Sequence, residues 1–226
     1  MIQTAVQAVL FDLDGTLVDS APDLALAVDR MLRDLGQESV GEERVREWVG
    51  NGARRLVERA LTGRLDGRLE ADQLEPALEI FFGHYADCLV ESTCAYPGVT
   101  EALEQLHLRG LPLAVVTNKP ARFTMPLLAH LGLRRYFHAV VSGDTLPHRK
   151  PDPGPLLLAA EQCGVAPGAA LMVGDSDNDV RAARAAGMPV ACVPYGYNHG
   201  DDIAAAGPDL ILESLLALPG ALEQAA

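Results

Sequence analysis

The chain has 226 residues, of which 49% are hydrophobic and 22% charged, a composition typical of a globular rather than a disordered protein. Its formal net charge of -13 argues against a nucleic-acid partner and against docking on an anionic membrane, because there is no basic surplus. The first residues lack a signal-peptide pattern, and no apolar stretch is long enough to cross a membrane, so we expect a cytoplasmic protein. The four cysteines form no CxxC pair, and we expect them to be small, reduced core residues.

Short apolar runs alternate with longer helical patterns over most of the chain. The runs do not alternate apolar and polar residues, which is typical of strands in a parallel sheet covered by helices on both faces. The expected strands are 8–11, 113–116, 139–141, 170–173, 190–193 and 209–212. The helices expected between them include 99–109, 121–131, 154–163 and 177–186. This alternation predicts a doubly wound α/β fold.

Residues 20–92 break the alternation. They contain no convincing strand, only amphipathic patterns such as those at 24–35 and 74–89. More than 70 helical residues are too many for one crossover between adjacent strands, so we predict an inserted helical subdomain. The core is then expected to consist of residues 1–19 and 93–226.

Acidic residues follow two of the expected strands. Asp12 and Asp14 come directly after the first strand, and side chains two apart in extended chain point the same way. Asp175 and Asp179 follow the fourth strand, where a helix begins. Acidic residues are common at turns and helix N-termini, but two acidic strand ends at the same edge of a sheet offer the hard oxygen ligands that suit Mg²⁺.

Groups suited to binding phosphate follow two other strands. Thr117 and Asn118 come after the second strand, and Lys150 precedes a helix after the third. A carboxylate that approaches a phosphate is repelled by about 4 kcal/mol per pair of unit charges at about 4 Å and an effective dielectric constant of about 20. A divalent cation together with a lysine reverses this repulsion, so we interpret these residues as a nucleophile, a metal site and a phosphate clamp.

Four motifs in this order resemble those of the haloacid dehalogenase superfamily of phosphotransferases. They are Asp12-Leu13-Asp14-Gly15-Thr16, Thr117 after an apolar strand, Lys150, and Gly174-Asp175 with Asp179. The resemblance implies an α/β fold in which a Rossmann-like parallel sheet core carries an α-helical cap domain, inserted after the first motif.

The same resemblance implies the roles of the acidic residues. Asp12 is expected to attack phosphorus and form an aspartyl-phosphate, while Asp14 protonates the leaving alkoxide and then activates water. Mg²⁺ is expected to be bound by Asp12, the main-chain carbonyl of Asp14 and Asp175. Asp179 is expected to contact these ligands and not the ion itself.

The implied substrate-binding groups come from both parts of the chain. Thr117, Asn118 and Lys150 are expected to bind phosphoryl oxygens. Substrate selection is expected in the cap, where Arg54 or Arg55 is our candidate for holding a substrate carboxylate, since guanidinium suits bidentate carboxylate recognition. The alternative is that both arginines belong to a solvated helix face.

Several reactions remain open within this resemblance. Dehalogenases lack an acid where Asp14 stands, and the related sugar phosphomutases usually carry valine in place of Thr16, so both residues favour phosphate hydrolysis. Longer stretches, such as Gly50-Asn51-Gly52-Ala53 and Tyr195-Gly196-Tyr197-Asn198, resemble the bacterial phosphoglycolate phosphatases. This makes 2-phosphoglycolate the expected small monoester substrate. The alternatives are a sugar-phosphate phosphatase of the N-acetylmuramic acid 6-phosphate type, a phosphomutase, and a non-enzymatic receiver module. The sequence carries no prediction of oligomeric state.

Overall fold

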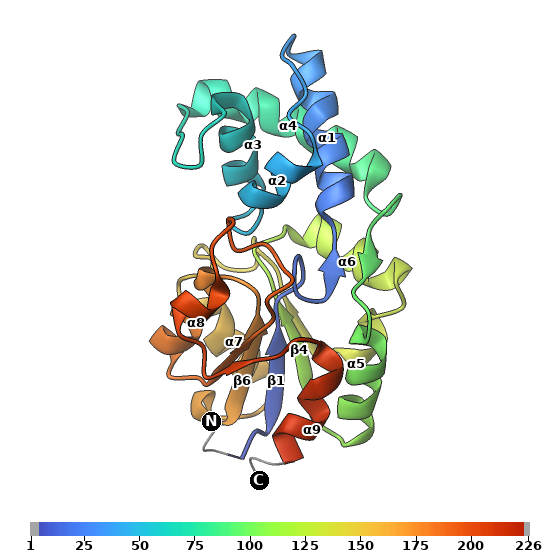
Figure 1. Ribbon diagram of the computed structural model, residues 1–226, viewed down its shortest axis with the longest axis vertical. Helices are drawn as coiled ribbons and strands as arrows, with labels where there is room; N and C mark the ends of the chain where they lie inside the picture. The colour runs from blue at the N-terminus through green and yellow to red at the C-terminus, as the bar shows by residue number, and fades with distance from the viewer. Residues whose placement is uncertain (1–4, 224–226) are drawn as a thin grey trace.

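The computed structural model describes residues 5–223 of the chain. Figure 1 shows two parts along the long axis of the molecule: a parallel sheet covered by helices, and a group of helices beyond the carboxyl ends of its strands. Within the described residues, no helix combines the length and the apolar character that a membrane span needs.

The sheet has six strands in the order β5-β4-β1-β6-β7-β8, and every neighbouring pair is parallel. The strands are β1 (Ala8–Phe11), β4 (Leu113–Val116), β5 (Ala139–Val141), β6 (Ala170–Gly174), β7 (Val190–Cys192) and β8 (Leu210–Ile211). The expected strands are therefore confirmed, with differences of one or two residues at their ends. The α/β fold class with a Rossmann-like parallel sheet is confirmed as well.

The central strand β1 packs against helices on both faces of the sheet. Val9 and Phe11 belong to one apolar cluster, together with residues of α5 (Val99–Leu108) and α6 (Ala121–His130). Ala8 and Leu10 belong to the opposite cluster, with residues of α7 (Gly154–Gln162) and α8 (Asp177–Ala186). Because successive side chains of a strand point to opposite faces, a strand covered on both sides must be apolar throughout. This explains the uninterrupted run of residues 8–11.

The second part consists of four helices that share an apolar cluster of their own. They are α1 (Ala21–Asp34), α2 (Glu42–Trp48), α3 (Ala53–Thr62) and α4 (Ala71–Cys88). In α1, the apolar positions Leu24, Val28, Met31 and Leu32 recur with helical spacing, and all four are buried. Helix α1 packs against α4, so each covers the apolar stripe of the other.

A short antiparallel ribbon joins the two parts. Strand β2 (Val18–Asp19) pairs with β3 (Cys94–Ala95), where the chain leaves the sheet and where it returns. The sequence did not predict this ribbon, because two residues are too short for a recognisable strand pattern. The predicted boundaries of the helical subdomain, at residues 20 and 92, lie beside this ribbon. The division of the chain into two domains stays a prediction.

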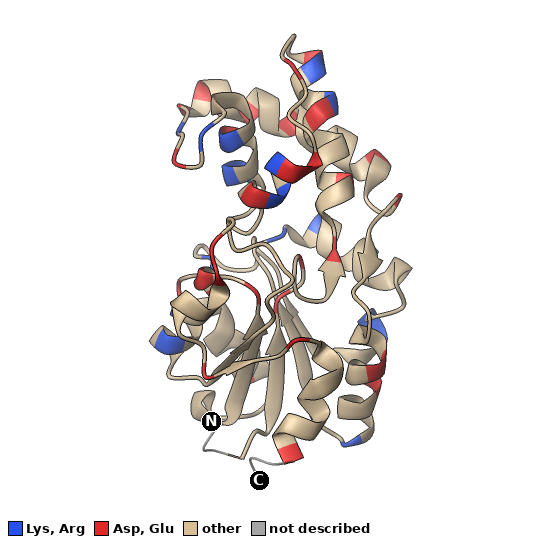
Figure 2. Ribbon diagram, viewed as in Figure 1, with Lys and Arg blue, Asp and Glu red and all other residues tan. Residues whose placement is uncertain are grey.

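The remaining helical segments lie around the sheet. They are α9 (Leu218–Glu223) and the short 3₁₀ helices at Arg134–Tyr136, Pro167–Ala169, Ile203–Ala206 and Leu215–Ala217. Figure 2 shows both signs of charge mixed along α1–α4, and acidic segments in the loops between these helices and the sheet.

Candidate active site

The carboxyl ends of the central strands place three polar side chains at one edge of the sheet. Asp12 follows β1, Thr117 follows β4 and Asp175 follows β6. The main-chain N–H of Asp12 donates to the carbonyl of Val173, and that of Thr117 donates to the carbonyl of Val141, each at 2.9 Å. The hydrogen-bond ladder of the parallel sheet thus continues one residue beyond β1 and β4. It fixes the main-chain positions of Asp12 and Thr117, from which their side chains extend.

Three buried carboxylates lie together at this edge. One oxygen from each of Asp12, Asp175 and Asp179 lies within 4.8 Å of the others. The Lys150 ammonium is 2.9 Å from Asp12 Oδ1 and 2.7 Å from Asp179 Oδ1. The structure therefore brings together four of the residues that the sequence singled out, although they lie up to 167 positions apart.

Among the described residues, the Asp175 carboxylate accepts hydrogen bonds from uncharged groups only. Its oxygens accept hydrogen bonds from the Thr16 hydroxyl at 2.7 Å and from the main-chain N–H of Tyr197 at 2.6 Å. Burial, reinforced by the neighbouring carboxylates of Asp12 and Asp179, holds the pKa of Asp175 well above its ordinary value. Burial also raises the pKa of Asp12 from 3.8 to about 7, even though the Lys150 ammonium opposes that rise.

The cluster has the composition of a divalent cation site. One lysine faces three carboxylates, which leaves two negative charges when all three are ionised. Taking carboxylates out of water without a compensating charge is costly, and burial of this kind is found where carboxylates are paired or bind metals. The charge and the hard oxygen donors both fit a divalent metal ion.

Asp179 is fully engaged by the protein. Its Oδ2 accepts hydrogen bonds from the Ser176 hydroxyl at 2.8 Å, from the Ser176 N–H at 3.1 Å and from the Asp175 N–H at 3.3 Å. Its Oδ1 faces Lys150. These contacts cap the N-terminus of α8 and orient both Lys150 and the Asp175 loop, which is the geometry of a supporting residue.

Glycines make room for the Asp175 carboxylate. Gly15 has φ of +87°, a conformation that residues with a Cβ rarely adopt, and a Cβ at this position would overlap the carboxylate of Asp175. A Cβ at Gly196 would overlap the same side chain from the opposite loop. The turn after Asp14 and the loop before Tyr197 are therefore shaped around this carboxylate.

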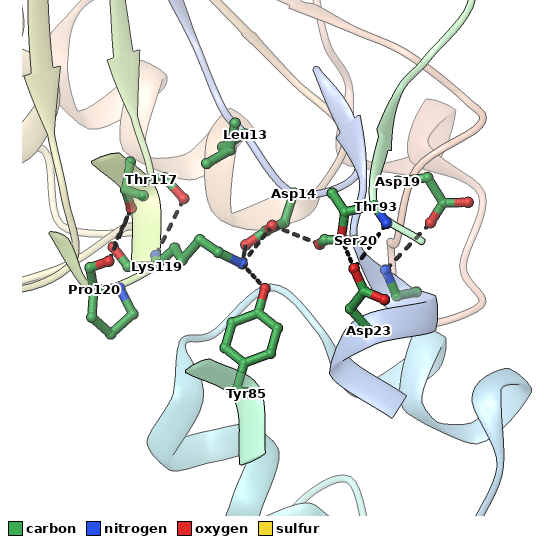
Figure 3. A network of polar contacts seen from close by, with 12 residues as sticks. Leu13, Asp14, Asp19, Ser20, Asp23, Tyr85, Thr93, Thr117, Lys119 and Pro120 are labelled. Atoms are coloured by element: carbon green, nitrogen blue, oxygen red, sulfur yellow. Dashed lines mark hydrogen bonds and ion pairs between the residues drawn. The ribbon is translucent and has the colours of Figure 1, made fainter. Parts of the chain in front are cut away.

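Asp14 lies in a different network, at the boundary with the helical part. Figure 3 shows the Lys119 side chain extending to Asp14 and to Tyr85 of helix α4. The Lys119 ammonium is 2.9 and 3.2 Å from the two Asp14 oxygens and 2.6 Å from the Tyr85 hydroxyl. The Ser20 hydroxyl donates to Asp14 Oδ1 at 2.6 Å. Burial acts to lower the pKa of Lys119, but Asp14 and Tyr85 together raise it above its ordinary value.

A pocket connects these two networks. Its polar lining comes from the core residues Asp12, Asp14, Thr117, Asn118 and Lys119, together with Tyr85. The rest is largely apolar and comes mainly from the helical part and from α6; it includes Leu24, Val49, Leu56, Phe81 and Phe123. The nucleophile candidate therefore opens into a space that is closed on its far side by the helices of residues 20–92.

Arg54 and Arg55 do not line this pocket. The Arg54 guanidinium is 2.5 Å from Glu75 Oε1 on the exposed face of the helical part. Arg55 forms an ion pair with Glu58 and donates to the carbonyl of Gly67 at 2.7 Å. Both arginines are thus held by partners within the helical part, and the structure offers no support for the expectation that one of them holds the substrate carboxylate.

The Asn118 amide is engaged with the main chain. Its nitrogen donates to the carbonyls of Gly50 and Lys150, each at 3.0 Å. It therefore ties the loop before α3 to the loop that carries Lys150. The Thr117 hydroxyl accepts from the N–H of Lys119 at 3.2 Å, and its own proton can still be donated to a ligand.

Three residues of the site have no sequence-based prediction: Lys119, Tyr85 and Ser20. The signal for Lys119 is its place directly after Thr117 and Asn118 at the end of a strand. Tyr85 stands four residues after Phe81 on the apolar stripe of α4, a spacing that indicates a core residue. Nothing in the local sequence indicates that its hydroxyl meets a lysine from the sheet.

Comparison with known proteins agrees with this geometry. Residues 6–187 match the family model of the haloacid dehalogenase-like hydrolases. The chain belongs to this family. The matched segment includes the whole acidic cluster, together with Thr117, Lys119 and Lys150.

Relatives of this haloacid dehalogenase-like hydrolase cover almost its whole length. Phosphoglycolate phosphatase of Nitrosococcus oceani is 50% identical over 220 residues, which are 97% of this chain and 98% of the relative. Phosphoglycolate phosphatase 1 of Pseudomonas aeruginosa is also 50% identical over 220 residues, covering 96% of this chain and 80% of the relative. The crystal structure of a predicted phosphoglycolate phosphatase from Haemophilus somnus superposes with a TM-score of 0.88 at 36% identity, covering 96% and 98% of the two chains.

Proposed function

We propose that this chain hydrolyses 2-phosphoglycolate to glycolate and inorganic phosphate, with Mg²⁺ as its cofactor and Asp12 as its nucleophile. The observation that carries the proposal is the position of Asp12, which lies between a buried acidic cluster with Lys150 and a small pocket closed by helices. The names of the relatives that match almost the whole chain support the choice of substrate.

The reaction proceeds in two steps. The Asp12 carboxylate attacks phosphorus, the bond from phosphorus to the ester oxygen breaks, and Asp14 gives its proton to the leaving glycolate oxygen. Asp14 then takes a proton from a water molecule that attacks the aspartyl-phosphate, which releases phosphate and restores Asp12. Lys150 and the Thr117 hydroxyl hold phosphoryl oxygens beside Asp12, whereas Asn118 would have to give up its main-chain partners to do so.

The metal has defined ligands in this proposal. Asp12, Asp175 and the main-chain carbonyl of Asp14 would hold Mg²⁺, while Asp179 orients Lys150 and the Asp175 loop. A divalent ion held there would offset the repulsion between the attacking carboxylate and the phosphate dianion. Mg²⁺ suits this site because it accepts few protein carboxylates and keeps several waters.

The pocket favours a small substrate over a sugar phosphate. Leu24, Val49, Leu56, Phe81 and Phe123 line it, and none of these side chains can hydrogen-bond with a hydroxyl. Several sugar hydroxyls would lose their water there, at a cost of about 1–3 kcal/mol for each one left unpaired. Glycolate has two carbons and one carboxylate, and it needs only one charged partner.

In the same proposal, residues 1–19 and 93–226 form the catalytic core, and 20–92 form a cap that closes over the substrate. The cytoplasm is the proposed compartment, and four free thiols at Cys88, Cys94, Cys163 and Cys192 are consistent with a reducing environment.

The proposal is tested by measuring phosphate release from 2-phosphoglycolate and from N-acetylmuramic acid 6-phosphate, each with Mg²⁺ and with EDTA. We expect repeated turnover of 2-phosphoglycolate with Mg²⁺ and without any bisphosphate activator, little activity on the sugar phosphate, and none in EDTA. Preference for the sugar phosphate would contradict the substrate assignment. A single turnover per chain would indicate a receiver module, and a need for bisphosphate would indicate a phosphomutase.

A further inference from the structure

Lys119 differs from the other cations of the described chain in its position. It belongs to the loop after β4, its side chain is buried, and no other lysine or arginine of the part of the chain that the structure describes lines the pocket. Lys150, the other buried lysine, does not line the pocket and already pairs with Asp12 and Asp179. Within residues 5–223, Lys119 therefore supplies the one positively charged side chain of the pocket lining.

The Lys119 ammonium is held in place by aromatic side chains. Its nitrogen is 2.6 Å from the Tyr85 hydroxyl and 4.8 Å from the centre of the Tyr85 ring. Tyr85 in turn stacks on Phe81, with ring centres 5.6 Å apart, and contacts Phe123, with ring centres 4.9 Å apart. A lysine packed in this way loses little further freedom when it binds an anion, which favours affinity.

The position of Asp14 relates Lys119 to the substrate. Asp14 must approach the ester oxygen to protonate it, and Lys119 is 2.9 Å from Asp14. In a 2-phospho-carboxylate, one carbon separates the ester oxygen from the carboxyl carbon, so standard bond lengths put the carboxylate oxygens about 3 Å from the ester oxygen. A carboxylate in this position lies within hydrogen-bonding range of a cation that touches Asp14.

We propose that Lys119 binds the carboxylate of the substrate and selects phosphate monoesters that carry a carboxylate on the carbon next to the ester carbon. Tyr85 is the residue that positions it. This inference rests on the proposed function, and it assigns to Lys119 the role for which the sequence suggested Arg54 or Arg55. In the bound state the ammonium donates to the substrate carboxylate as well as to Asp14, since it has three protons to donate.

The test compares 2-phosphoglycolate with ethyl phosphate, which has the same two carbons but no carboxylate. Both have alkoxide leaving groups that need Asp14, so the ratio of their kcat/KM values cancels any effect of a variant on Asp14 itself. We expect Lys119→Met to lower this ratio about 10- to 100-fold, the range for loss of a hydrogen bond to a charged group. Lys119→Arg keeps the charge and is expected to retain most of the preference. Arg54→Ala, which removes a cation outside the pocket, is the matched control and should leave the ratio unchanged.

If a variant turns over too slowly for its kcat/KM to be measured, a binding measurement tests the same inference. In the Asp12→Asn background, calorimetric titration with 2-phosphoglycolate and with inorganic phosphate separates the two anionic groups of the substrate. We expect Lys119→Met to weaken 2-phosphoglycolate binding about 10- to 100-fold and to leave phosphate binding unchanged.

The inference is overturned if Lys119→Met weakens both ligands alike or lowers kcat/KM for both substrates by the same factor. It is also overturned if Arg54→Ala, and not Lys119→Met, changes the ratio. If the wild-type protein releases no phosphate from 2-phosphoglycolate, the proposed function itself fails, so the two failures are distinguishable.

Discussion

Replacing Asp12 with asparagine should abolish turnover and yet stabilise the metal-free protein. Burial raises the pKa of Asp12 from 3.8 to about 7 against the opposing attraction of the Lys150 ammonium. Between these two values the folded protein binds the Asp12 proton more tightly than the unfolded chain does, so its stability falls as the pH rises through this window. Asparagine does not ionise, so the stability of the variant does not fall with pH for this reason.

The size of the effect follows from the pKa difference. Each unit is worth about 1.4 kcal/mol, so the raised pKa reduces the free energy of unfolding, relative to a side chain that never ionises, by about 4 kcal/mol near pH 8, where the folded Asp12 is ionised. Near pH 5, where the folded Asp12 stays protonated and the unfolded one ionises, the reduction is about 2 kcal/mol. We expect Asp12→Asn to exceed the wild type by about these amounts in EDTA, because the substitution leaves the Lys150–Asp179 pair in place. Adding Mg²⁺ should favour the wild type, since metal binding stabilises the folded state that has the ligands.

Urea unfolding followed by circular dichroism in EDTA, at about pH 5 and about pH 8, measures the difference. Asp177→Asn is the matched control: Asp177 is exposed, forms an ion pair with Arg181 at 3.4 Å, and should show the same small change at both pH values. If Asp12→Asn is less stable than the wild type near pH 8, or if its advantage does not grow with pH, the account of the buried cluster is wrong.

The other predictions concern neighbouring groups. Asp14→Asn should reduce turnover of 2-phosphoglycolate about 10²- to 10⁴-fold and that of p-nitrophenyl phosphate far less, because nitrophenolate leaves without a proton; equal losses would rule out the acid role. Tyr197→Phe removes a hydroxyl that donates to Asp19 and accepts from two main-chain N–H groups at the start of α1. It should lower the free energy of unfolding by about 1–3 kcal/mol. An unchanged denaturation midpoint would show that water replaces these bonds. Gly15→Ala should diminish the rise in Tm on adding Mg²⁺, because the new Cβ overlaps Asp175; an undiminished rise would contradict the placement of the metal. That rise in the wild type should be larger near pH 8 than near pH 5, since the ligands must lose their protons to bind the ion, and the reverse order would contradict the raised pKa values.

Most of the fold and of the candidate site could be predicted from the apolar runs and from the residues that follow them. The run at 8–11 predicts a strand buried on both faces, and because parallel strands end at one edge, the residues after them must meet. Asp12, Asp175 and Lys150 could therefore be assigned to one site without knowing any contact. The two-residue strands β2 and β3 could not, since their pairing depends on how the helical part docks.

Side-chain partners were not predictable in the same way. Arg54 suits carboxylate recognition by its chemistry, yet its partner is Glu75, which only the packing of α3 against α4 brings near. Lys119 and Asp14 are 105 residues apart, and Tyr85 belongs to an apolar helical stripe that indicates packing alone. Residue types and spacing identify which groups lie at the site, whereas the docking of the helical part determines which of them touch.

The central claim is that the Asp12 carboxylate becomes bonded to phosphorus. Acid quenching of the enzyme during steady-state turnover of 2-phosphoglycolate, followed by mass spectrometry of its peptides, tests this directly. The account predicts a phosphoryl group on the peptide that contains Asp12, absent without substrate and absent in Asp12→Asn. Sustained turnover with no such peptide at any time, together with an active Asp12→Asn variant, would contradict it.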